Sequence, residues 1–408
     1  REQGEEAAGG APQRGSYETD PLRPESLVVA SAEPFNAEPP VEALVETVVT
    51  PVRHFFVRNH SPVPHFSPVE AAGGARYSLT VDGAVERPTL FHAVGDLVAR
   101  FPVVTTVAAL QCAGNRRTEM AEVRPVRGLP WKAGAVGNAQ WRGVRLRDVL
   151  LAAGVPAVGD AASAELHVAL EGWDGIKEHG FQQGYGSSIP LAKALSTEVG
   201  GEVILAFEMN GEPLTPDHGA PLRVVVPGYI GARSVKWVKR ITVQPEVSSN
   251  FYMQRDYKLF PANIGWDEVG QYWDRASPIQ EMNVQCVICR VDPAARTQIL
   301  GDPRASRSRT PVRVCGYALA GGGRLIERVD VSSDHGQTWT YATLVQKHRF
   351  GWCLWMATVD AEPPCQLVAR AFDESSNTQP EHMASIWNLR GVLGNAWHRV
   401  TLPATSSL

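Results

Sequence analysis

The feature that most constrains the fold is a change in residue pattern near residues 262–275. Beyond it the chain alternates apolar and polar residues in short runs such as ValGlnCysValIleCys, ThrTrpThrTyrAlaThrLeuVal and LeuValAlaArgAlaPhe. Alternation with a period of two is typical of half-buried β-strands, and AspHisGlyGln at 334–337 is typical of a hairpin turn. Five or more such strands predict an antiparallel, immunoglobulin-like β-sandwich over residues 270–405.

The residues before this change predict a mixed domain. A chain of 408 residues exceeds what one hydrophobic core usually holds, so at least two domains are expected. A β-prone run at 103–110 lies among stretches of helical spacing at 90–100 and 145–153, and 222–244 suggests two strands joined by a Gly-rich turn. We therefore predict an α+β chain, with a mixed α/β domain over residues 25–265 ahead of the sandwich.

The first residues predict a flexible tail or linker. Residues 1–24 are mainly Gly, Ala, Glu and Pro, with too few large apolar side chains to offset the entropy of ordering. Because the sequence begins with Arg1 rather than Met, a targeting peptide or a haem domain ahead of it is left open.

Composition and charge exclude several classes of protein. A net charge of -4 disfavours a protein that coats nucleic acid or an anionic membrane surface. No run of about 18 apolar residues could span a bilayer as a helix, so no membrane partner is expected. The 6 scattered cysteines do not form the disulfide framework of a small secreted domain and favour a reducing or neutral compartment.

The densest candidate for chemistry is LeuGlnCysAlaGlyAsnArgArgThrGlu at 110–119. Neighbouring guanidinium groups favour a thiolate over a thiol, and the thiolate is the form that binds metals or attacks electrophiles. Cys112 is therefore a candidate ligand or nucleophile. The alternative is a buried cysteine at the end of a strand, followed by a surface pair of arginines.

Three further clusters carry polar groups that could bind a ligand. PhePheValArgAsnHis at 55–60 could grip a flat ring and an anion, although such stretches also end ordinary strands. The segments 217–227 and 231–237 supply Arg223, Arg233, Ser234 and Lys236, which suit a phosphate or simply form a solvated basic loop. AspTyrLys at 256–258 and TrpAsnLeuArgGly at 387–391 add a phenol and an arginine from distant parts of the chain.

Other common motifs lack support. Cys286 and Cys289 form a single CxxC pair inside an alternating run, without a second pair at zinc spacing, so we interpret them as residues of the sandwich. The sequence has no P-loop, no GxGxxG after a strand, no HExxH and no GxSxG. A haem-binding segment of the HisProGlyGly type is absent too, so no haem is expected in this chain.

Taken together, these clusters resemble the sulfite oxidase family, and the resemblance runs from about Glu33 to Arg399. It rests on GluProPheAsnAlaGluProPro, the Cys112 cluster, ProLeuArgValValValProGly, GlyAlaArgSerValLysTrp and TrpAsnLeuArgGlyVal. The family holds molybdenum through the two dithiolene sulfurs of a pterin and one cysteine thiolate, which the resemblance places at Cys112. Sulfur ligands suit a metal that cycles between oxidation states.

The resemblance also implies the remaining site residues. The contacts to the pterin and its phosphate fall on Phe56, Val57, Arg58, Asn59, His60, Cys112, Gly172, Trp173, Asp174, His218, Arg223, Ser234, Val235 and Lys236. The catalytic residues fall on Arg58, Cys112, Arg117, Trp131, Tyr257 and Arg390, of which all but Cys112 form the oxyanion pocket. Arginine forks suit a small dianion because each binds several oxygens and keeps its charge near neutral pH.

The implied activity is oxidation of sulfite to sulfate. Oxygen is the expected electron acceptor, as in plant members without a haem domain, or cytochrome c if a haem domain lies upstream. The sandwich is expected to form a homodimer, as it does in relatives. The terminal SerSerLeu resembles the peroxisomal SerLysLeu address, or else ends a flexible tail, so a peroxisomal location is expected, with the mitochondrial intermembrane space as the alternative.

Two other functions remain open. The molybdenum domain of a nitrate reductase resembles the same cysteine cluster, but that family tends to have methionine where Arg390 stands, and an extra arginine suits doubly charged sulfite. An inactive cofactor-binding carrier is the second alternative. It is disfavoured because the cysteine, the arginines and Tyr257 are all present.

Overall fold

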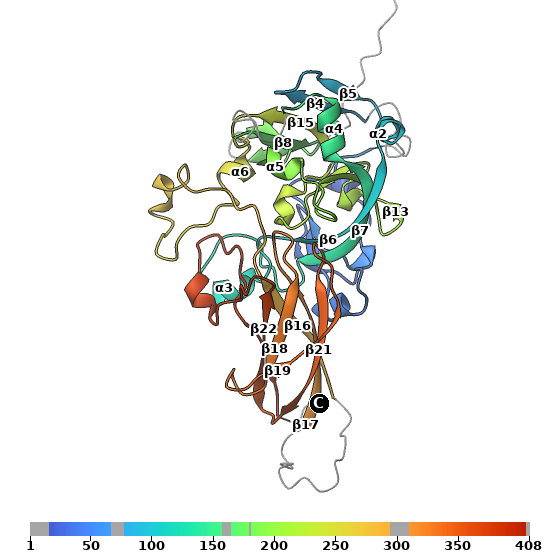
Figure 1. Ribbon diagram of the computed structural model, residues 1–408. Coiled ribbons are helices and arrows are strands. Elements are labelled where there is room, and N and C mark those ends of the chain that lie inside the picture. Colours follow the sequence, from blue (N-terminus) through green and yellow to red (C-terminus); the bar gives the residue numbers. More distant parts are fainter. Residues whose placement is uncertain (1–15, 67–76, 157–164, 179–180, 294–309, 405–408) are drawn as a thin grey trace, which may run out of the picture.

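The computed structural model describes residues 16–66, 77–156, 165–178, 181–293 and 310–404. Helices and mixed sheets form the upper part of the molecule in Figure 1, and a β-sandwich forms the lower part. The helices are α2 (Val94–Arg100), α3 (Arg117–Val123), α4 (Leu146–Ala152), α5 (Leu191–Ala194) and α6 (Phe251–Gln254). The short 3-10 helices are η1 (Tyr17–Thr19), η2 (Val41–Val45), η3 (Val52–His54), η4 (Pro216–His218), η5 (Gly231–Arg233), η6 (Val269–Gln271) and η7 (Met383–Ile386).

One five-stranded sheet of the upper domain has the order β11-β8-β15-β4-β5. Strands β15 and β4 are parallel and the other neighbours are antiparallel. Alternate residues of β8 are buried, as expected for a strand with one face on the core. The strands are β4 (Leu79–Gly83), β5 (Thr89–Phe91), β8 (His167–Gly172), β11 (Gly186–Pro190) and β15 (Val238–Gln244).

A second five-stranded sheet positions the cysteine. It has the order β13-β12-β7-β6, and β14 also pairs with β12. Strands β6 and β7 stay in register from Val103 opposite Val144 to Gln111 opposite Val136, so Cys112 lies directly beyond the last pair. The strands are β6 (Val103–Gln111), β7 (Val136–Arg145), β12 (Ile204–Met209), β13 (Glu212–Pro213) and β14 (Arg223–Val225). The small sheets contain β1 (Val28–Ser31), β2 (Asn36–Glu38) and β3 (Val57–Arg58), and β9 (Ile176–Glu178) and β10 (Phe181–Gln183).

The C-terminal domain is the β-sandwich that the alternation predicts. Two four-stranded antiparallel sheets, β16-β17-β21-β20 and β19-β18-β22-β23, enclose a core that includes Val331, Trp355 and Leu367. The strands are β16 (Gln285–Pro293), β17 (Thr310–Leu319), β18 (Ile326–Ser332), β19 (Thr340–Tyr341), β20 (Thr343–Gln346), β21 (Cys353–Ala361), β22 (Cys365–Asp373) and β23 (His398–Leu402). The expected α+β fold with a C-terminal β domain is confirmed.

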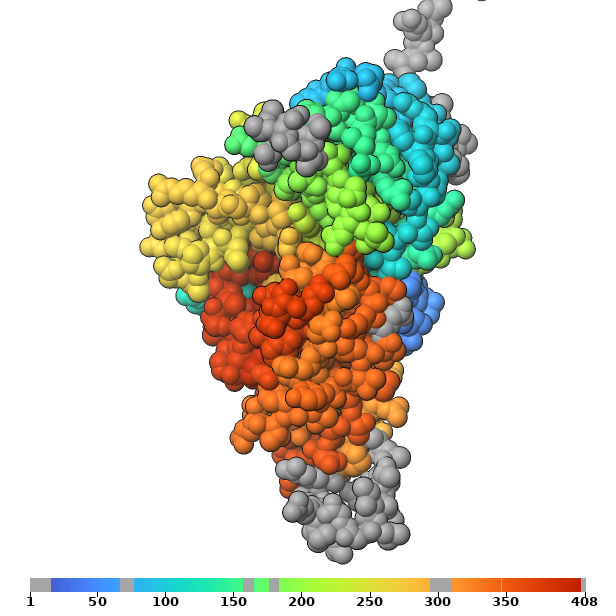
Figure 2. Space-filling view, viewed as in Figure 1, coloured from blue at the N-terminus to red at the C-terminus, as the bar shows by residue number. Residues whose placement is uncertain are grey.

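The two domains share buried surface. Tyr317 and Leu319 of β17, together with Trp352, belong to the hydrophobic core of the upper domain rather than to that of the sandwich. A lobe around residues 255–275, yellow in Figure 2, lies beside the C-terminal segment, where Phe260 packs in one cluster with Trp387. The sandwich therefore shares a hydrophobic core with the upper domain.

Most local predictions agree with the structure. The helix expected at 145–153 is α4, the strand at 103–110 is β6, and 222–244 contains β14 and β15. The hairpin at 334–337 joins antiparallel strands, and Cys286 and Cys289 are buried in β16 as sandwich residues. The helix expected over 90–100 is wrong at its start, because residues 90 and 91 belong to β5 and pair with β4.

The expected tail is described only in part. Residues 1–15 lie outside the described residues. From Ser16 onward the chain contacts the upper domain, because the Arg23 guanidinium pairs with Asp20 at 2.8 Å and with Asp217 at 2.9 Å. Among the described residues, no helix has both the length and the apolar character needed to cross a membrane.

Candidate active site

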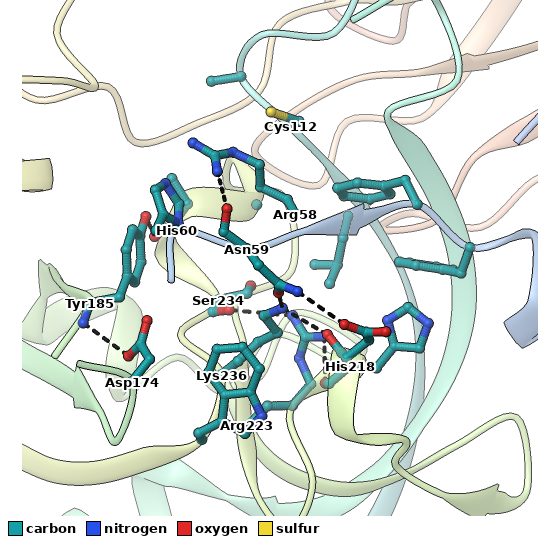
Figure 3. Close-up of a pocket in the computed structure, with 18 of the residues that line it drawn as sticks. Arg58, Asn59, His60, Cys112, Asp174, Tyr185, His218, Arg223, Ser234 and Lys236 are labelled. Atoms are coloured by element: carbon teal, nitrogen blue, oxygen red, sulfur yellow. Dashed lines mark hydrogen bonds between the residues drawn. The ribbon is translucent and has the colours of Figure 1, made fainter. Parts of the chain in front are cut away.

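Loops from both sheets of the upper domain line a pocket. Figure 3 shows Cys112 at one end, Arg223, Ser234 and Lys236 at the other, and Arg58 between them. The lining residues are Phe55, Phe56, Arg58, Asn59, His60, Leu110, Cys112, Ala113, Asp174, Tyr185, Asp217, His218, Arg223, Gly231, Ala232, Ser234, Lys236, Trp237 and Tyr257. The pocket therefore has a sulfur end and a basic end.

Cys112 is held by the backbone at the end of β6. Its N–H donates to the Ala135 carbonyl at 2.9 Å, and its own carbonyl accepts from the Asn115 N–H at 2.9 Å. The turn aims the sulfur toward the pocket, near Arg58 (Figure 3), and leaves the residue 6% exposed. A thiol in this position can reach a ligand in the pocket while bulk water reaches it poorly.

The basic end is built from the AspHisGly and GlyAlaArgSerValLys segments. Arg223 donates to the His218 carbonyl at 2.9 Å and to the Ser234 carbonyl at 3.3 Å, but its buried Nε has no partner in the described part of the chain. Gly219 has φ +105, and a Cβ there would lie 3.0 Å from the Arg223 side chain and 3.1 Å from that of Lys236. Only glycine fits this turn without disturbing the two cations.

Burial lowers the pKa of the basic groups at this end. Burial, opposed by Asp217 and reinforced by Arg223, lowers the pKa of Lys236 to about 7. Burial likewise lowers the pKa of Arg223 to about 9. Burial, with Lys236 and Arg223, lowers the pKa of His218 to about 3, so this imidazole is neutral at neutral pH. The lowered pKa values of Lys236 and Arg223 show that these buried cations are not fully balanced by nearby negative charge. A bound anion would therefore stabilise their charged forms.

Asp217 contacts three other residues at the basic end of the pocket. Its carboxylate accepts from the Asn59 amide at 2.9 Å and from the Arg23 Nε at 2.9 Å, and the Lys236 ammonium donates to its carbonyl at 2.7 Å. Lys236 also contacts the Asn59 side-chain oxygen. Lys236 is thereby held at the pocket by Asn59 and Asp217, which come from two distant parts of the sequence.

Aromatic rings form one wall of the pocket. The His60 ring stacks on Tyr185 with centroids 4.5 Å apart, and its Nε2 lies 3.2 Å from the Tyr257 hydroxyl. Burial, together with Arg58 and Lys236, holds the pKa of His60 well below its usual value, so the imidazole is neutral. Beneath Tyr185, Asp174 accepts the Tyr185 N–H at 3.0 Å, and burial raises its pKa to about 6.

A second, outer pocket adjoins the first. Arg58 and His60 line both pockets, so they form part of the wall between them. In the outer pocket Arg390 forms an ion pair with Asp256. Burial lowers the pKa of Arg58, but Tyr257 and Cys112 outweigh that effect and raise it, so the guanidinium stays charged. The outer pocket thus presents three arginines, Arg58, Arg255 and Arg390, together with the Asp256 carboxylate.

The structure brings most of the predicted site residues to the two pockets. Phe56, Arg58, Asn59, His60, Cys112, Asp174, His218, Arg223, Ser234, Lys236 and Tyr257 line the inner pocket, and Arg390 lines the outer one. Six others lie behind these walls: Val57, Arg117, Trp131, Gly172, Trp173 and Val235. The assigned roles of all of these residues remain predictions.

Arg117, one of these six residues, holds two neighbouring loops. The Arg117 guanidinium donates to the carbonyls of Arg390 and Gly391, both at 3.1 Å, and of Leu129 at 2.9 Å. Trp131 is fully buried, and its indole Nε1 has no hydrogen-bond partner among the described residues. Arg117 therefore fixes the segment that carries Arg390, and its own charge lies close behind the site.

Sequence reasoning missed several lining residues. Asp217 could have been found, because it is the first residue of the 217–227 segment that supplies Arg223. Tyr185 gave no signal, since it lies in an unremarkable Gly-rich stretch and reaches the site only through the pairing of β8 and β11. The others are Phe55, Leu110, Ala113, Gly231, Ala232 and Trp237.

Comparison with known proteins identifies the class. Residues 60–252 match the oxidoreductase molybdopterin binding domain, and residues 276–405 match the Mo-co oxidoreductase dimerisation domain. Fold, pocket and matches together define a molybdenum–pterin oxidoreductase.

Curated relatives narrow the class to a family. The chain is 43% identical over 401 residues to a sulfite oxidase from Arabidopsis thaliana, covering 95% of this chain and 96% of that protein. It is 46% identical over 387 residues to sulfite oxidase from Gallus gallus, covering 93% and 78% respectively. The chain belongs to the sulfite oxidase family, which confirms the resemblance seen in its sequence.

More distant relatives share the fold. A nitrate reductase from Hordeum vulgare is 37% identical over 393 residues, which cover 93% of this chain and 42% of that protein. Among solved structures, the sulfane dehydrogenase SoxCD from Paracoccus pantotrophus superposes with a TM-score of 0.70 at 27% identity, covering 98% of this chain and 93% of that one.

Proposed function

We propose that this chain oxidises sulfite to sulfate at a molybdenum–pterin centre bound in the inner pocket. The observation that carries the proposal is the arrangement of a thiol and a basic cradle at opposite ends of one pocket, with Arg58 between them (Figure 3). The high identity to sulfite oxidases over almost the whole chain favours sulfite over other anions.

The residues present fit such a group. Cys112 would supply a thiolate to the metal. Lys236 and the Nε of Arg223, which has no hydrogen-bond partner among the described residues, would bind the phosphate of the pterin. When bound, the molybdenum–pterin group supplies the two-electron redox chemistry that converts sulfite to sulfate. The neutral imidazoles of His60 and His218 can offer either a donor or an acceptor to the ring system.

The protein's own task is to hold the anion. Arg58 and Arg390 present planar forks that bind a tetrahedral or pyramidal oxyanion through several oxygens at once. Tyr257 lies next to Arg58, and burial raises the pKa of its phenol although Arg58 opposes this, so the hydroxyl remains a hydrogen-bond donor at neutral pH. Arg117 adds positive charge behind these groups and fixes the backbone of Arg390.

The proposed acceptor is oxygen. Sulfite, water and oxygen then give sulfate and hydrogen peroxide, with two electrons passing from sulfur to oxygen. Cytochrome c would replace oxygen if a haem domain preceded this sequence. The match of residues 276–405 to a dimerisation domain supports assembly as a homodimer through the sandwich.

The proposed location is the peroxisome, on the basis of the terminal SerSerLeu, with the mitochondrial intermembrane space as the alternative. A fluorescent protein fused ahead of this chain should co-localise with peroxisomes and lose that pattern when the three residues are removed. A mitochondrial or unchanged pattern would contradict the assignment.

The activity is tested with protein made in a host that synthesises the pterin. Sulfite should drive oxygen uptake with stoichiometric peroxide, faster than it drives reduction of cytochrome c, in protein that contains molybdenum. Nitrate reduction without sulfite oxidation would instead indicate a nitrate reductase. Molybdenum without turnover of either anion would indicate a carrier. Light scattering should give twice the mass of one chain, and a monomer mass would contradict the dimer.

A further inference from the structure

We propose that Tyr317 of the sandwich is a positioning residue for Cys112, acting through the side chain of Asn115. Tyr317 lies on β17, more than two hundred positions along the chain from the cysteine, and is fully buried against the upper domain. The inference rests on the proposed role of Cys112 as the metal ligand, and it assigns a part in that role to the C-terminal domain.

The contact is a closed hydrogen-bond network. The Asn115 amide nitrogen donates to the Tyr317 hydroxyl at 3.2 Å, and that hydroxyl donates to the Ala133 carbonyl at 2.9 Å. The Asn115 side-chain oxygen in turn accepts from the Ala135 N–H at 3.0 Å. Tyr317 and Asn115 together tie the turn after Cys112 to residues 133–135.

The same residues set the direction of the cysteine. Ala135 accepts the N–H of Cys112, and Asn115 closes the turn by donating its backbone N–H to the Cys112 carbonyl. Both backbone contacts of Cys112 therefore involve residues that the network fixes. Removing the Tyr317 hydroxyl would leave the Asn115 amide and the Ala133 carbonyl buried without that partner, and the turn would shift to satisfy them.

The phenol itself is held rigidly. Its ring stacks on Trp352 with centroids 5.4 Å apart and planes inclined by 24°, and the Trp352 indole donates to the Val48 carbonyl at 2.8 Å. Because an aromatic ring locked in this way cannot follow a moving loop, it acts as a fixed point for Asn115. The sandwich thus supplies an anchor that the cysteine loop lacks by itself.

The test compares Tyr317→Phe with Tyr77→Phe. Tyr77 is also buried and donates to a backbone carbonyl, that of Val238, but it lines neither pocket, so its variant reports the loss of a buried hydroxyl alone. In cofactor-free protein, Tyr317→Phe should speed alkylation of Cys112 by about three- to tenfold, the range that corresponds to one buried hydrogen bond. Tyr77→Phe should lower the Tm without changing that rate.

Two further measurements separate positioning from stability. In molybdenum-loaded protein, Tyr317→Phe should shift the electron paramagnetic resonance signal of the metal, whereas Tyr77→Phe should not. Asn115→Ala should speed alkylation at least as much as Tyr317→Phe does, because it also removes the contact to the Ala135 N–H. The double variant should be no faster than Asn115→Ala alone, because the Tyr317 hydroxyl acts through the Asn115 side chain. Additive rates, or wild-type rates and spectra in Tyr317→Phe, would overturn the proposal. The alkylation rate does not depend on sulfite turnover. An unchanged alkylation rate would therefore count against the role of Tyr317 without counting against the proposed function.

Discussion

Arg390 is ion-paired with Asp256, and the pair lies in the outer pocket beside Arg58. Asp256 is 7% exposed, so its carboxylate is screened only weakly by solvent. A buried negative charge at a site built for an anion both holds the arginine in place and competes with the substrate for it. We therefore expect the pair to set the balance between anion binding and product release.

Neutralising this carboxylate should tighten anion binding. In Asp256→Asn the KM for sulfite should fall by about threefold, and inhibition by sulfate should strengthen similarly, because a nearby repulsive charge is lost. Steady-state kinetics with added sulfate measure both effects. The control is Asp292→Asn, which removes the partner of Arg290 in an exposed pair of the sandwich at 2.9 Å and should change neither constant appreciably. A higher KM in Asp256→Asn would show that the carboxylate orients Arg390 rather than competing with the substrate.

Arg58→Gln should raise the KM for sulfite by about tenfold or more with a smaller effect on kcat, because it removes a charge-assisted contact to the anion. Arg58→Lys keeps the charge but loses the planar fork, so it should recover only part of the affinity. The two variants are compared by initial rates over a range of sulfite concentrations. Wild-type kinetics in Arg58→Gln would remove this residue from the oxyanion site.

Binding of phosphate at the basic end should depend on pH. Since the pKa of Lys236 is lowered to about 7, its ammonium is present below that pH and is lost above it. Calorimetric titration of cofactor-free protein with inorganic phosphate should therefore give weaker binding as the pH rises through about 7. Phosphate itself gains charge over this range, so its own titration cannot cause the weakening.

Lys236→Arg is the matched control for this titration. The guanidinium keeps its charge throughout the range, so the loss of affinity with rising pH should disappear. If wild type and Lys236→Arg have the same pH profile, Lys236 does not bind the phosphate.

The sequence predicted the individual helices and strands better than it predicted which of them pair with one another. The alternation after residue 275 identified the sandwich because strands with one buried face have a period that is visible in a single chain. The helix expected at 90–100 began too early because residues 90 and 91 pair with β4, and such long-range pairing leaves little trace in a short apolar run.

The candidate site shows the same limit. Cys112, Lys236 and Arg223 stood out because charged and sulfur-bearing residues follow strands in recognisable motifs. The link between Asn115 and Tyr317 gave no such signal, since it joins two domains through a hydroxyl on an ordinary strand. The ion pair of Asp256 was equally hidden, because nothing in sequence spacing places it beside Arg390.

Replacing Cys112 tests the metal site. Cys112→Ser should abolish sulfite turnover, because it removes the thiolate from the metal, while the buried position and its backbone contacts preserve the fold. The circular dichroism spectrum should therefore match that of the wild type. The change in Tm should correspond to no more than about 1 kcal/mol in the free energy of unfolding. Retained turnover in this variant would place the essential sulfur elsewhere.

The most direct measurement is X-ray absorption at the molybdenum edge of loaded wild type and loaded Cys112→Ser. The variant should show one sulfur neighbour fewer than the wild type, because Cys112 is proposed to supply one of the sulfurs around the metal. An identical sulfur count in the two proteins would contradict the assignment of Cys112 and the active site built upon it.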